Sequence, residues 1–201
     1  MNIDDLANPS VKIVFIGDSG VGKSSIICQY DKGEVPKDIL PTIGAAYLSK
    51  IYSKNDIEIE LRMWDTAGQE TYQSLAPIYF LHSKIGFVVF DITQRSTFEN
   101  ITKWVSQLRE FAGSDVIIVI VANKLDLEEK RQVKKEEYTK LASDLNTLVA
   151  ETSAVNGDGV TNMVNQAMDA LISSNNDMKY ELSLRKKKNE QRGLGDRQMC
   201  C

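Results

Sequence analysis

A short segment near the start of this chain limits its possible folds more than any other feature. Residues 17–24 read Gly-Asp-Ser-Gly-Val-Gly-Lys-Ser and match the pattern Gly-x-x-x-x-Gly-Lys-Ser/Thr at every position. Glycines let backbone N–H groups approach phosphate oxygens, and a helix N-terminus adds positive potential. The segment therefore predicts a phosphate-binding loop, with Lys23 on the outer phosphates and Ser24 on a magnesium ion. The alternative is a glycine turn that only precedes a helix.

Strand-like and helix-like segments alternate along the chain. Strands are predicted at 11–16, 45–53, 57–64, 85–91, 116–122 and 147–151, the second and third forming an antiparallel hairpin. Helices are predicted from Ser25 to Lys32 and at 96–112, 134–145 and 158–172, with a weakly helical stretch up to His82. A proline- and glycine-broken segment, 33–44, predicts a mobile loop. The pattern is typical of an α/β fold with a mainly parallel sheet covered on both faces.

Ligands of such sheets bind at the carboxyl ends of the strands, so the residues that follow each strand become functional candidates. Asp65 ends an apolar strand where a carboxylate can reach magnesium, and Gly68 allows a backbone N–H to approach the last phosphate. Asn123 and Asp126 follow another strand. A carboxylate there can accept both the N1 and the N2 protons of guanine, which adenine does not offer. Alone, this pair could also be an ordinary turn, but beside a phosphate loop it favours guanine.

Composition and charge divide the chain into two parts. The 201 residues, 42% hydrophobic and 26% charged, suit one globular domain. No apolar run approaches the ~20 residues of a membrane span, and the N-terminus does not read as a signal peptide, so we expect a cytosolic protein. The net charge is −4, yet residues 173–201 carry seven basic and four acidic residues, which predicts different surroundings for this tail.

Taken together, these motifs resemble those of the Ras-like small GTPases and, among them, the Rab branch. The resemblance covers about residues 10–172, preceded by a leader, 1–9, and followed by a tail, 173–201. The matching motifs are Gly17–Ser24, Pro41–Gly44 with Thr42, Trp64–Glu70, Asn123–Asp126 and Glu151–Ala154. The resemblance implies a P-loop NTPase G domain whose six-stranded sheet has one antiparallel edge strand and helices on both faces.

The resemblance also implies the ligands, GTP or GDP with Mg²⁺, and a role for each matching residue. It implies that Ser24 and Thr42 are ligands of Mg²⁺ and that Asp65 holds the ion through water. It also implies that Gln69 orients the attacking water. Catalysis would then depend on Gln69, Lys23 and Thr42. The implied nucleotide contacts are Ser19, Gly20, Val21, Gly22, Lys23, Ser24, Ser25, Thr42, Gly68, Asn123, Lys124, Asp126, Ser153 and Ala154.

Two switch segments, about 35–47 and 65–80, are implied by the same resemblance, ordered by the γ-phosphate and relaxed after hydrolysis. Tyr47, Trp64 and Tyr79 resemble the aromatic surface that Rab proteins present to effectors. The alternative is that these rings only pack on one another under the loop. The other implied partners are an exchange factor, a GTPase-activating protein, a prenylation escort and a GDP-dissociation inhibitor. No nucleic-acid partner is expected.

Several positions depart from the family pattern. Val35 stands where an aromatic ring usually packs on guanine, which favours faster nucleotide release. Thr71 stands where a basic residue is usual, and Ser19 where Ras-like proteins often carry glycine. His82 is interpreted as a surface residue without chemistry. Cys28 is expected to be a small core residue.

The tail combines a basic run, 185–188, with a terminal pair, Cys200 and Cys201. In Rab proteins such a pair implies two geranylgeranyl chains, which anchor a protein stably. The alternative is a solvated charge run with two reactive thiols. We expect the cytosol and the cytoplasmic face of intracellular membranes. Residues 42–48 and 74–77 resemble the early-endosomal subclass.

Two other classes of function stay open on the sequence alone. A P-loop metabolic enzyme, such as a nucleotide kinase, would need a second substrate pocket and a lid, and the segments 65–69 and 123–126 argue against it. A nucleotide-locked GTP-binding scaffold with little hydrolysis is the second alternative, which Val35 makes conceivable.

Overall fold

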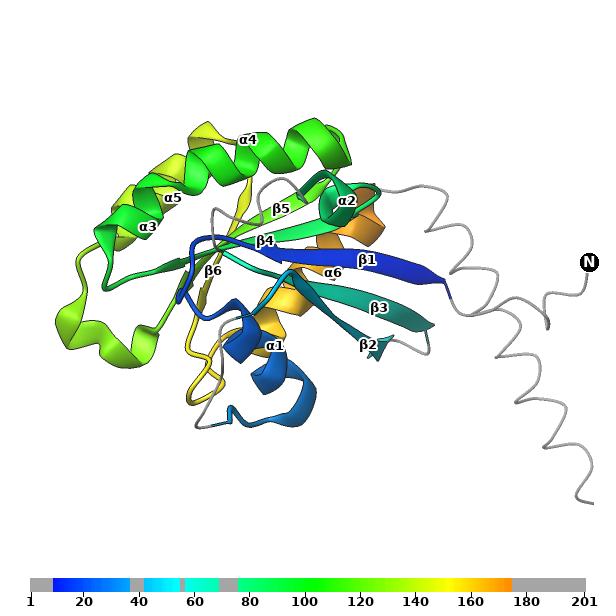
Figure 1. Ribbon diagram of the computed structural model, residues 1–201, viewed down its shortest axis with the longest axis horizontal. Coiled ribbons are helices and arrows are strands. Elements are labelled where there is room, and N and C mark those ends of the chain that lie inside the picture. Colours follow the sequence, from blue (N-terminus) through cyan, green and yellow to red (C-terminus); the bar gives the residue numbers. More distant parts are fainter. Residues whose placement is uncertain (1–8, 37–41, 55–56, 69–75, 175–201) are drawn as a thin grey trace, which may run out of the picture.

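The computed structural model describes residues 9–36, 42–54, 57–68 and 76–174, and these form a central sheet between two sets of helices (Figure 1). The strands are β1 (Ser10–Ile16), β2 (Ala45–Lys54), β3 (Ile57–Thr66), β4 (Ile85–Asp91), β5 (Ile117–Asn123) and β6 (Leu148–Thr152). The helices are α1 (Lys23–Lys32), α2 (Ala76–Phe80), α3 (Arg95–Glu99), α4 (Ile101–Ala112), the 3-10 helix η3 (Leu125–Lys130), α5 (Lys135–Asp144) and α6 (Val160–Ser174).

The sheet has six strands in the order β2-β3-β1-β4-β5-β6. Only β2 runs antiparallel to its neighbour, β3, whereas the remaining neighbours pair in parallel. The predicted mainly parallel sheet with one antiparallel edge strand and helices on both faces is therefore confirmed. In this order β1 is central, so the loop that follows it lies between the loops of β3 and β4.

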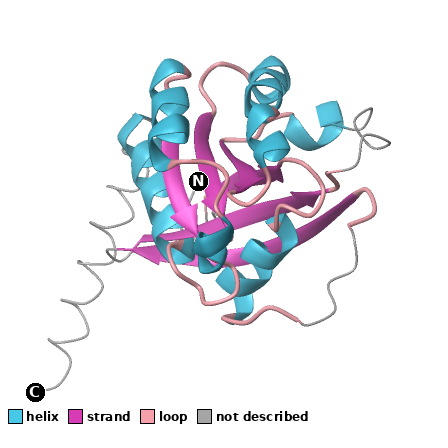
Figure 2. Ribbon diagram, turned by 90° about the vertical axis from the view of Figure 1, so that its left-hand side faces the viewer, coloured by secondary structure: helices cyan, strands magenta, loops and turns pink. Residues whose placement is uncertain are grey.

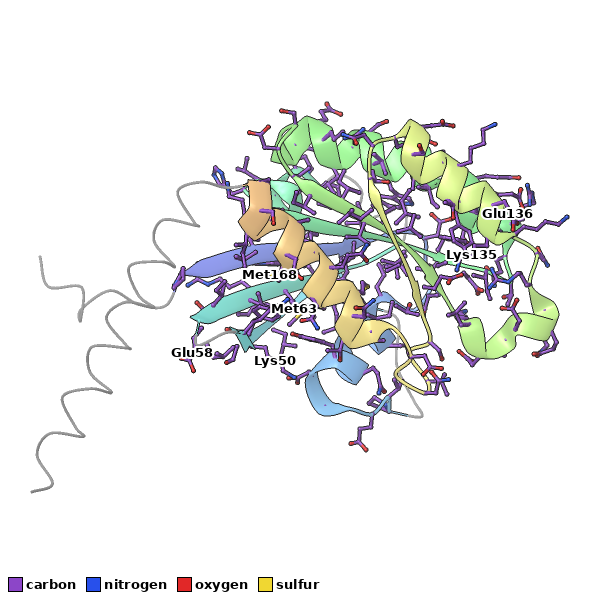
Figure 3. The ribbon with its side chains drawn as sticks, turned by 180° about the vertical axis from the view of Figure 1, so that it is seen from behind. Lys50, Glu58, Met63, Lys135, Glu136 and Met168 are labelled. Carbon is purple, nitrogen blue, oxygen red and sulfur yellow. The ribbon has the colours of Figure 1, made fainter. Side chains whose placement is uncertain are left out.

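Helices α1 and α6 cover one face of the sheet, and α3, α4 and α5 cover the other (Figures 1 and 2). Alternate residues of β1 supply both cores: Ile13 and Phe15 face α1 and α6, whereas Val14 faces α4 and α5. Met63 of β3 and Met168 of α6, both fully buried, belong to the first core and are labelled in Figure 3.

Close packing of α4 on the sheet requires a glycine in β4. A Cβ at Gly86 would lie 2.1 Å from Cδ2 of Leu108, which is fully buried on α4. The glycine therefore leaves the space that the side chain of Leu108 fills against the strand.

The C-terminal end of α1 is fixed to β2. Lys50 of β2, labelled in Figure 3, donates hydrogen bonds to the carbonyls of Tyr30 at 2.7 Å and Asp31 at 2.8 Å. A cation at a helix C-terminus is favourable because it meets the unpaired carbonyls there. The hairpin is thereby tied to the helix that begins at the phosphate loop.

The structure corrects the sequence-based expectations in two places. The helix predicted at 96–112 is two helices, α3 and α4, which meet at Asn100. The side chain of Asn100 donates a 2.7 Å hydrogen bond to Oδ2 of Asp18, a tertiary contact that helical periodicity does not reveal. Cys28 is half-buried, not part of the core, and burial raises the pKa of its thiol. As expected, His82 is exposed.

None of the helices within the described ranges has the length and apolar character needed to cross a bilayer.

Candidate functional site

The loops after β1, β3, β5 and β6 meet at the carboxyl end of the sheet. Asn123, at the end of β5, links two of them: its Nδ2 donates a 2.8 Å hydrogen bond to the carbonyl of Val21, in the loop after β1. Its Oδ1 accepts a 3.0 Å hydrogen bond from the hydroxyl of Thr152, at the end of β6. Loops separated by long stretches of sequence thus form one continuous site.

Glycines shape the loop that follows β1. Gly22 adopts φ of 99° and is the residue before α1, and a Cβ there would lie 2.3 Å from Nδ2 of Asn123. Gly17 adopts φ of 137°, and a Cβ there would lie 2.2 Å from the carbonyl oxygen of Val89. Both positions combine a left-handed backbone with contacts too close for a side chain, so the loop can curl tightly ahead of the helix.

Lys23 lies inside this loop, with only 6% of its surface exposed. Its Nζ donates hydrogen bonds to the carbonyl of Gly17 at 3.0 Å and to that of Asp18 at 2.8 Å. Burial lowers the pKa of Lys23 to about 8, against the opposing effect of the carboxylates of Asp65 and Asp18. The ammonium is thereby held at the centre of the loop, where a phosphate would be its natural counter-ion.

Three side-chain oxygens, from α1, β3 and the segment before β2, converge beside Lys23. The hydroxyl of Ser24 lies 2.5 Å from Oδ2 of Asp65 and 2.9 Å from the hydroxyl of Thr42, and Thr42 Oγ1 lies 3.1 Å from the same Oδ2. Burial raises the pKa of Asp65, while the hydrogen bonds from Ser24 and Thr42 oppose that rise.

The oxygen cluster of Ser24, Thr42 and Asp65 fits a hard divalent cation. Oδ1 of Asp65 is buried without a hydrogen-bond partner in the structure, and an unpaired buried oxygen is costly unless a ligand satisfies it. Mg²⁺ prefers oxygen ligands, one or two carboxylates and substrate phosphates. Among the described residues, no group of three or more His, Cys, Asp or Glu side chains could hold a metal ion. The mixed hydroxyl and carboxylate set, with its unpaired Oδ1, is the candidate metal site.

The loop after β5 presents a carboxylate held by a neighbouring loop. Asp126 is exposed, and its Oδ1 accepts a 2.5 Å hydrogen bond from the hydroxyl of Ser153, which is fully buried. Ala154, the next residue, is also buried. A fixed carboxylate of this kind can read a pair of N–H donors on a flat heterocycle.

Lys124 has a partner that the sequence did not indicate. Its backbone is left-handed, with φ of 71°, and its Nζ lies 2.6 Å from Oδ2 of Asp91, which is 1% exposed. The other oxygen of Asp91 accepts hydrogen bonds from the backbone N–H and hydroxyl of Thr93. A carboxylate at the end of β4 therefore orients Lys124 in the loop after β5.

Gly68 brings the segment after β3 against the phosphate loop. A Cβ at this position would lie 2.4 Å from the carbonyl carbon of Asp18 and from the amide nitrogen of Ser19. The segment after β3 therefore packs directly on the peptide between Asp18 and Ser19 in the phosphate loop.

An aromatic surface lies beside the site. The ring of Trp64 is 5.4 Å from that of Tyr47 and 5.8 Å from that of Tyr79, and Nζ of Lys12 lies 5.2 Å from the Trp64 ring. Half of the surface of Tyr47 is exposed. Trp64 contacts both tyrosines, and Trp64 and Tyr79 also pack against the second core, as the packing alternative requires. The exposed ring of Tyr47 and the half-buried rings of Trp64 and Tyr79 leave part of this surface open to a partner.

Some predicted site residues lie outside the described part of the chain: Gln69, Thr71, residues 74–75, Cys200 and Cys201. Val35 is half-buried and packs against the first core. The remaining predicted nucleotide and metal residues lie in the four converging loops, at the adjoining ends of strands and helices, or, for Thr42, on the segment before β2. Asp91, Asn100 and Trp104 could not be linked to the site from the sequence, because their contacts with it are formed only by the tertiary structure.

Comparison with known protein families agrees with this geometry. The model of the Ras family matches residues 12–173, which include the four loops and all but the first two residues of β1 and the last residue of α6 among the described elements.

Proposed function

The chain belongs to the Ras family, and from that premise we propose that it is a Rab-type GTP/GDP switch that recruits effectors to membranes in vesicle trafficking, in its endocytic branch. Members of the Ras family are GTP hydrolases that bind GTP or GDP with Mg²⁺ and interact with exchange factors, activating proteins and effectors. Such proteins hold their switch segments through the γ-phosphate and release them after hydrolysis.

Contacts between the segments before β2 and after β3 support a switch. Thr42 contacts Ser24 and Asp65 in the oxygen cluster. Two residues later, the carbonyl of Gly44 accepts a 2.9 Å hydrogen bond from the N–H of Ala67. A change at the phosphate end of the site would therefore reach both segments together, and β2 with them.

The aromatic surface of Tyr47, Trp64 and Tyr79 is the observation that carries the Rab assignment. Its rings come from β2, β3 and α2, so its shape depends on both switch segments. Ile43 and Ile78, close to it in sequence, are 81% and 68% exposed. Exposed apolar and aromatic residues of this kind are typical of protein-binding surfaces.

We propose that hydrolysis is slow without an activating protein. Water attacks the γ-phosphorus, the bond to the β–γ bridging oxygen breaks, and GDP and phosphate leave. Ser24, Thr42 and Asp65 would hold Mg²⁺, which would supply positive charge to the phosphate oxygens. Lys23 stabilises the same charge, and Gln69 orients the water.

The arginines within the described ranges do not supply an internal charge for this step. Each is engaged away from the site: Arg62 with Glu60, Arg95 with Glu137, Arg109 with the Leu145 carbonyl, and Arg131 with Glu128. An arginine from an activating protein would therefore accelerate turnover strongly, as in related GTPases.

The tail supports membrane attachment in this proposal. Two prenyl chains on Cys200 and Cys201, assisted by the basic run 185–188, would anchor the protein, and an escort and a GDP-dissociation inhibitor would handle the lipids. The expected location is the cytoplasmic face of intracellular membranes, including the early endosome. In cells that prenylate it, a tagged full chain with both cysteines changed to Ser is expected to become wholly cytosolic.

Effector binding tests the Rab assignment directly. The GTP-loaded and GDP-loaded full chain are titrated against purified effector domains specific for endosomal Rab proteins and against a domain specific for Ras itself. We expect binding to an endosomal Rab effector only in the GTP form, and its loss in Trp64→Ala with nucleotide affinity close to that of the parent. Binding to the Ras effector alone would overturn the assignment, and equal loss of nucleotide and effector binding would favour the packing alternative for Trp64.

A further inference from the structure

We propose that Asp18 is a positioning residue that fastens the phosphate loop to the junction of α3 and α4. Its Oδ1 accepts a 2.8 Å hydrogen bond from the indole Nε1 of Trp104, and its Oδ2 accepts a 2.7 Å hydrogen bond from Nδ2 of Asn100. These donors lie more than 80 residues further along the chain. The inference rests on the proposed nucleotide binding, because the fastened loop is the phosphate-binding one.

On the loop side, Asp18 is in contact with two parts of the candidate site. Its carbonyl accepts a 2.8 Å hydrogen bond from Nζ of Lys23. The same peptide unit, between Asp18 and Ser19, is the surface against which Gly68 lies. A shift of Asp18 would therefore displace the lysine and the approach of the segment after β3 together.

On the helix side, the attachment point is rigid. Trp104 is 5% exposed and belongs to the core between the sheet and α4. Asn100 stands between α3 and α4, where one helix ends and the next begins. A buried indole allows little movement, so its N–H defines where the carboxylate of Asp18 must lie.

The two hydrogen bonds also direct a negative charge away from the phosphates. An acidic side chain in a phosphate-binding loop would repel a nucleotide if it turned into the loop. Two N–H donors instead hold the carboxylate against the helix junction, and hydrogen bonds to charged acceptors are the stronger kind. The backbone N–H groups of the loop thereby stay available to phosphates, and the carboxylate of Asp18 points away from them.

The first test measures how fast a fluorescent GDP analogue dissociates from the full chain after Mg²⁺ is chelated. Trp104→Phe keeps the ring but removes the indole N–H, and we expect dissociation about tenfold faster. In an Asp18→Ala background the same change is expected to add nothing, because the partner is already absent.

Val105→Ala is the matched control. Val105 is the next residue of α4, 1% exposed, and its truncation weakens the same helix without touching Asp18. We expect a lower unfolding midpoint with dissociation close to the parent rate. If Val105→Ala accelerates dissociation as much as Trp104→Phe does, or if Trp104→Phe still acts fully in the Asp18→Ala background, the positioning role is overturned.

A second measurement tests the link independently of nucleotide. The chain has two tryptophans, so a Trp64→Phe background leaves the indole N–H resonance of Trp104 alone in the tryptophan side-chain region of a ¹⁵N-labelled spectrum. We expect Asp18→Ala to move this resonance upfield and to speed its exchange with solvent. An unmoved resonance would refute the proposed link. If the parent fails to bind guanine nucleotide while the resonance moves, the proposed function fails and the link stands.

Discussion

The side chain of Asn123 joins the carbonyl of Val21 in the phosphate loop to the hydroxyl of Thr152 at the end of β6, through hydrogen bonds of 2.8 Å and 3.0 Å. Asn123 is 1% exposed, and all of its polar side-chain atoms are directed at other parts of the site. One amide therefore sets the spacing between the subsite for phosphates and the subsite for the base.

Asn123→Ala is expected to weaken nucleotide binding about a hundredfold, because it leaves two buried polar groups without partners at ~1–3 kcal/mol each. Titration calorimetry with GDP and Mg²⁺ measures the loss. Thr152→Val removes only one of the two bonds, and about a tenfold loss is expected there. Parent-like affinity in Asn123→Ala would show that the two loops hold their spacing without this amide.

Asp126→Asn is expected to change the preferred base from guanine to xanthine. The carboxylate accepts two N–H groups from guanine, whereas an amide offers an acceptor oxygen for the N1 proton and an NH₂ donor that suits the C2 carbonyl of xanthine. GTP affinity should therefore fall by at least about a hundredfold while XTP affinity rises. Competition against a fluorescent nucleotide measures both. An unchanged preference for GTP would remove Asp126 from base recognition.

Gly68→Ala is expected to separate the response to GTP from the binding of GDP. The new Cβ would lie 2.4 Å from backbone atoms of Asp18 and Ser19, so the segment after β3 must move away from the loop. GTP affinity should fall about tenfold or more, since the contact to the last phosphate is lost. GDP affinity is the internal control, and an equal loss of both would point to a damaged phosphate loop instead.

Gln69→Leu is expected to trap the GTP state, because leucine cannot orient the attacking water. Single-turnover hydrolysis is measured for the parent and the variant, each with and without cell extract as a source of activating protein. The parent should hydrolyse GTP slowly alone and faster with extract. The variant should show almost no hydrolysis, with or without extract. Absence of hydrolysis in the parent under both conditions would favour the nucleotide-locked scaffold.

Glu137→Gln is expected to reduce stability at neutral pH and to lose this effect in acid. The hydrogen bonds from Arg95 and from the backbone of Lys134 hold the pKa of Glu137 at about 2, below its ordinary 4.5. A lowered pKa in the folded state stabilises above pH ~4.5, and the contribution disappears as the pH falls towards 2. Urea unfolding of parent and variant between pH 3 and 7 measures the difference.

Glu136→Gln is the control for this prediction. It removes the same charge from the first turn of α5 but leaves the contact between Arg95 and Glu137 in place. Figure 3 shows Glu136 beside Lys135 at this end of the helix. A difference between Glu137→Gln and the parent that stays constant with pH would contradict the ionic origin of the stabilisation.

Most of the fold could be predicted from the sequence, because apolar runs and turns follow the chain locally. The strand ends located the four loops, since parallel strands place their carboxyl ends on one edge of a sheet. The break between α3 and α4 at Asn100 could not be predicted, because the side chain of Asn100 is hydrogen-bonded to Asp18, 82 residues away in the sequence. The ion pair of Lys124 with Asp91 was missed for the same reason.

The glycine in the middle of β4 has a consequence for how this sequence can vary. Any larger residue at position 86 would have to displace the side chain of Leu108, which is fully buried on α4. Trp104 is one turn away on that helix, so its indole would shift relative to the phosphate loop. Nucleotide affinity therefore restricts the choice of residue at a site inside the core, and a design that fills this position for β-propensity would weaken binding without altering a single ligand contact.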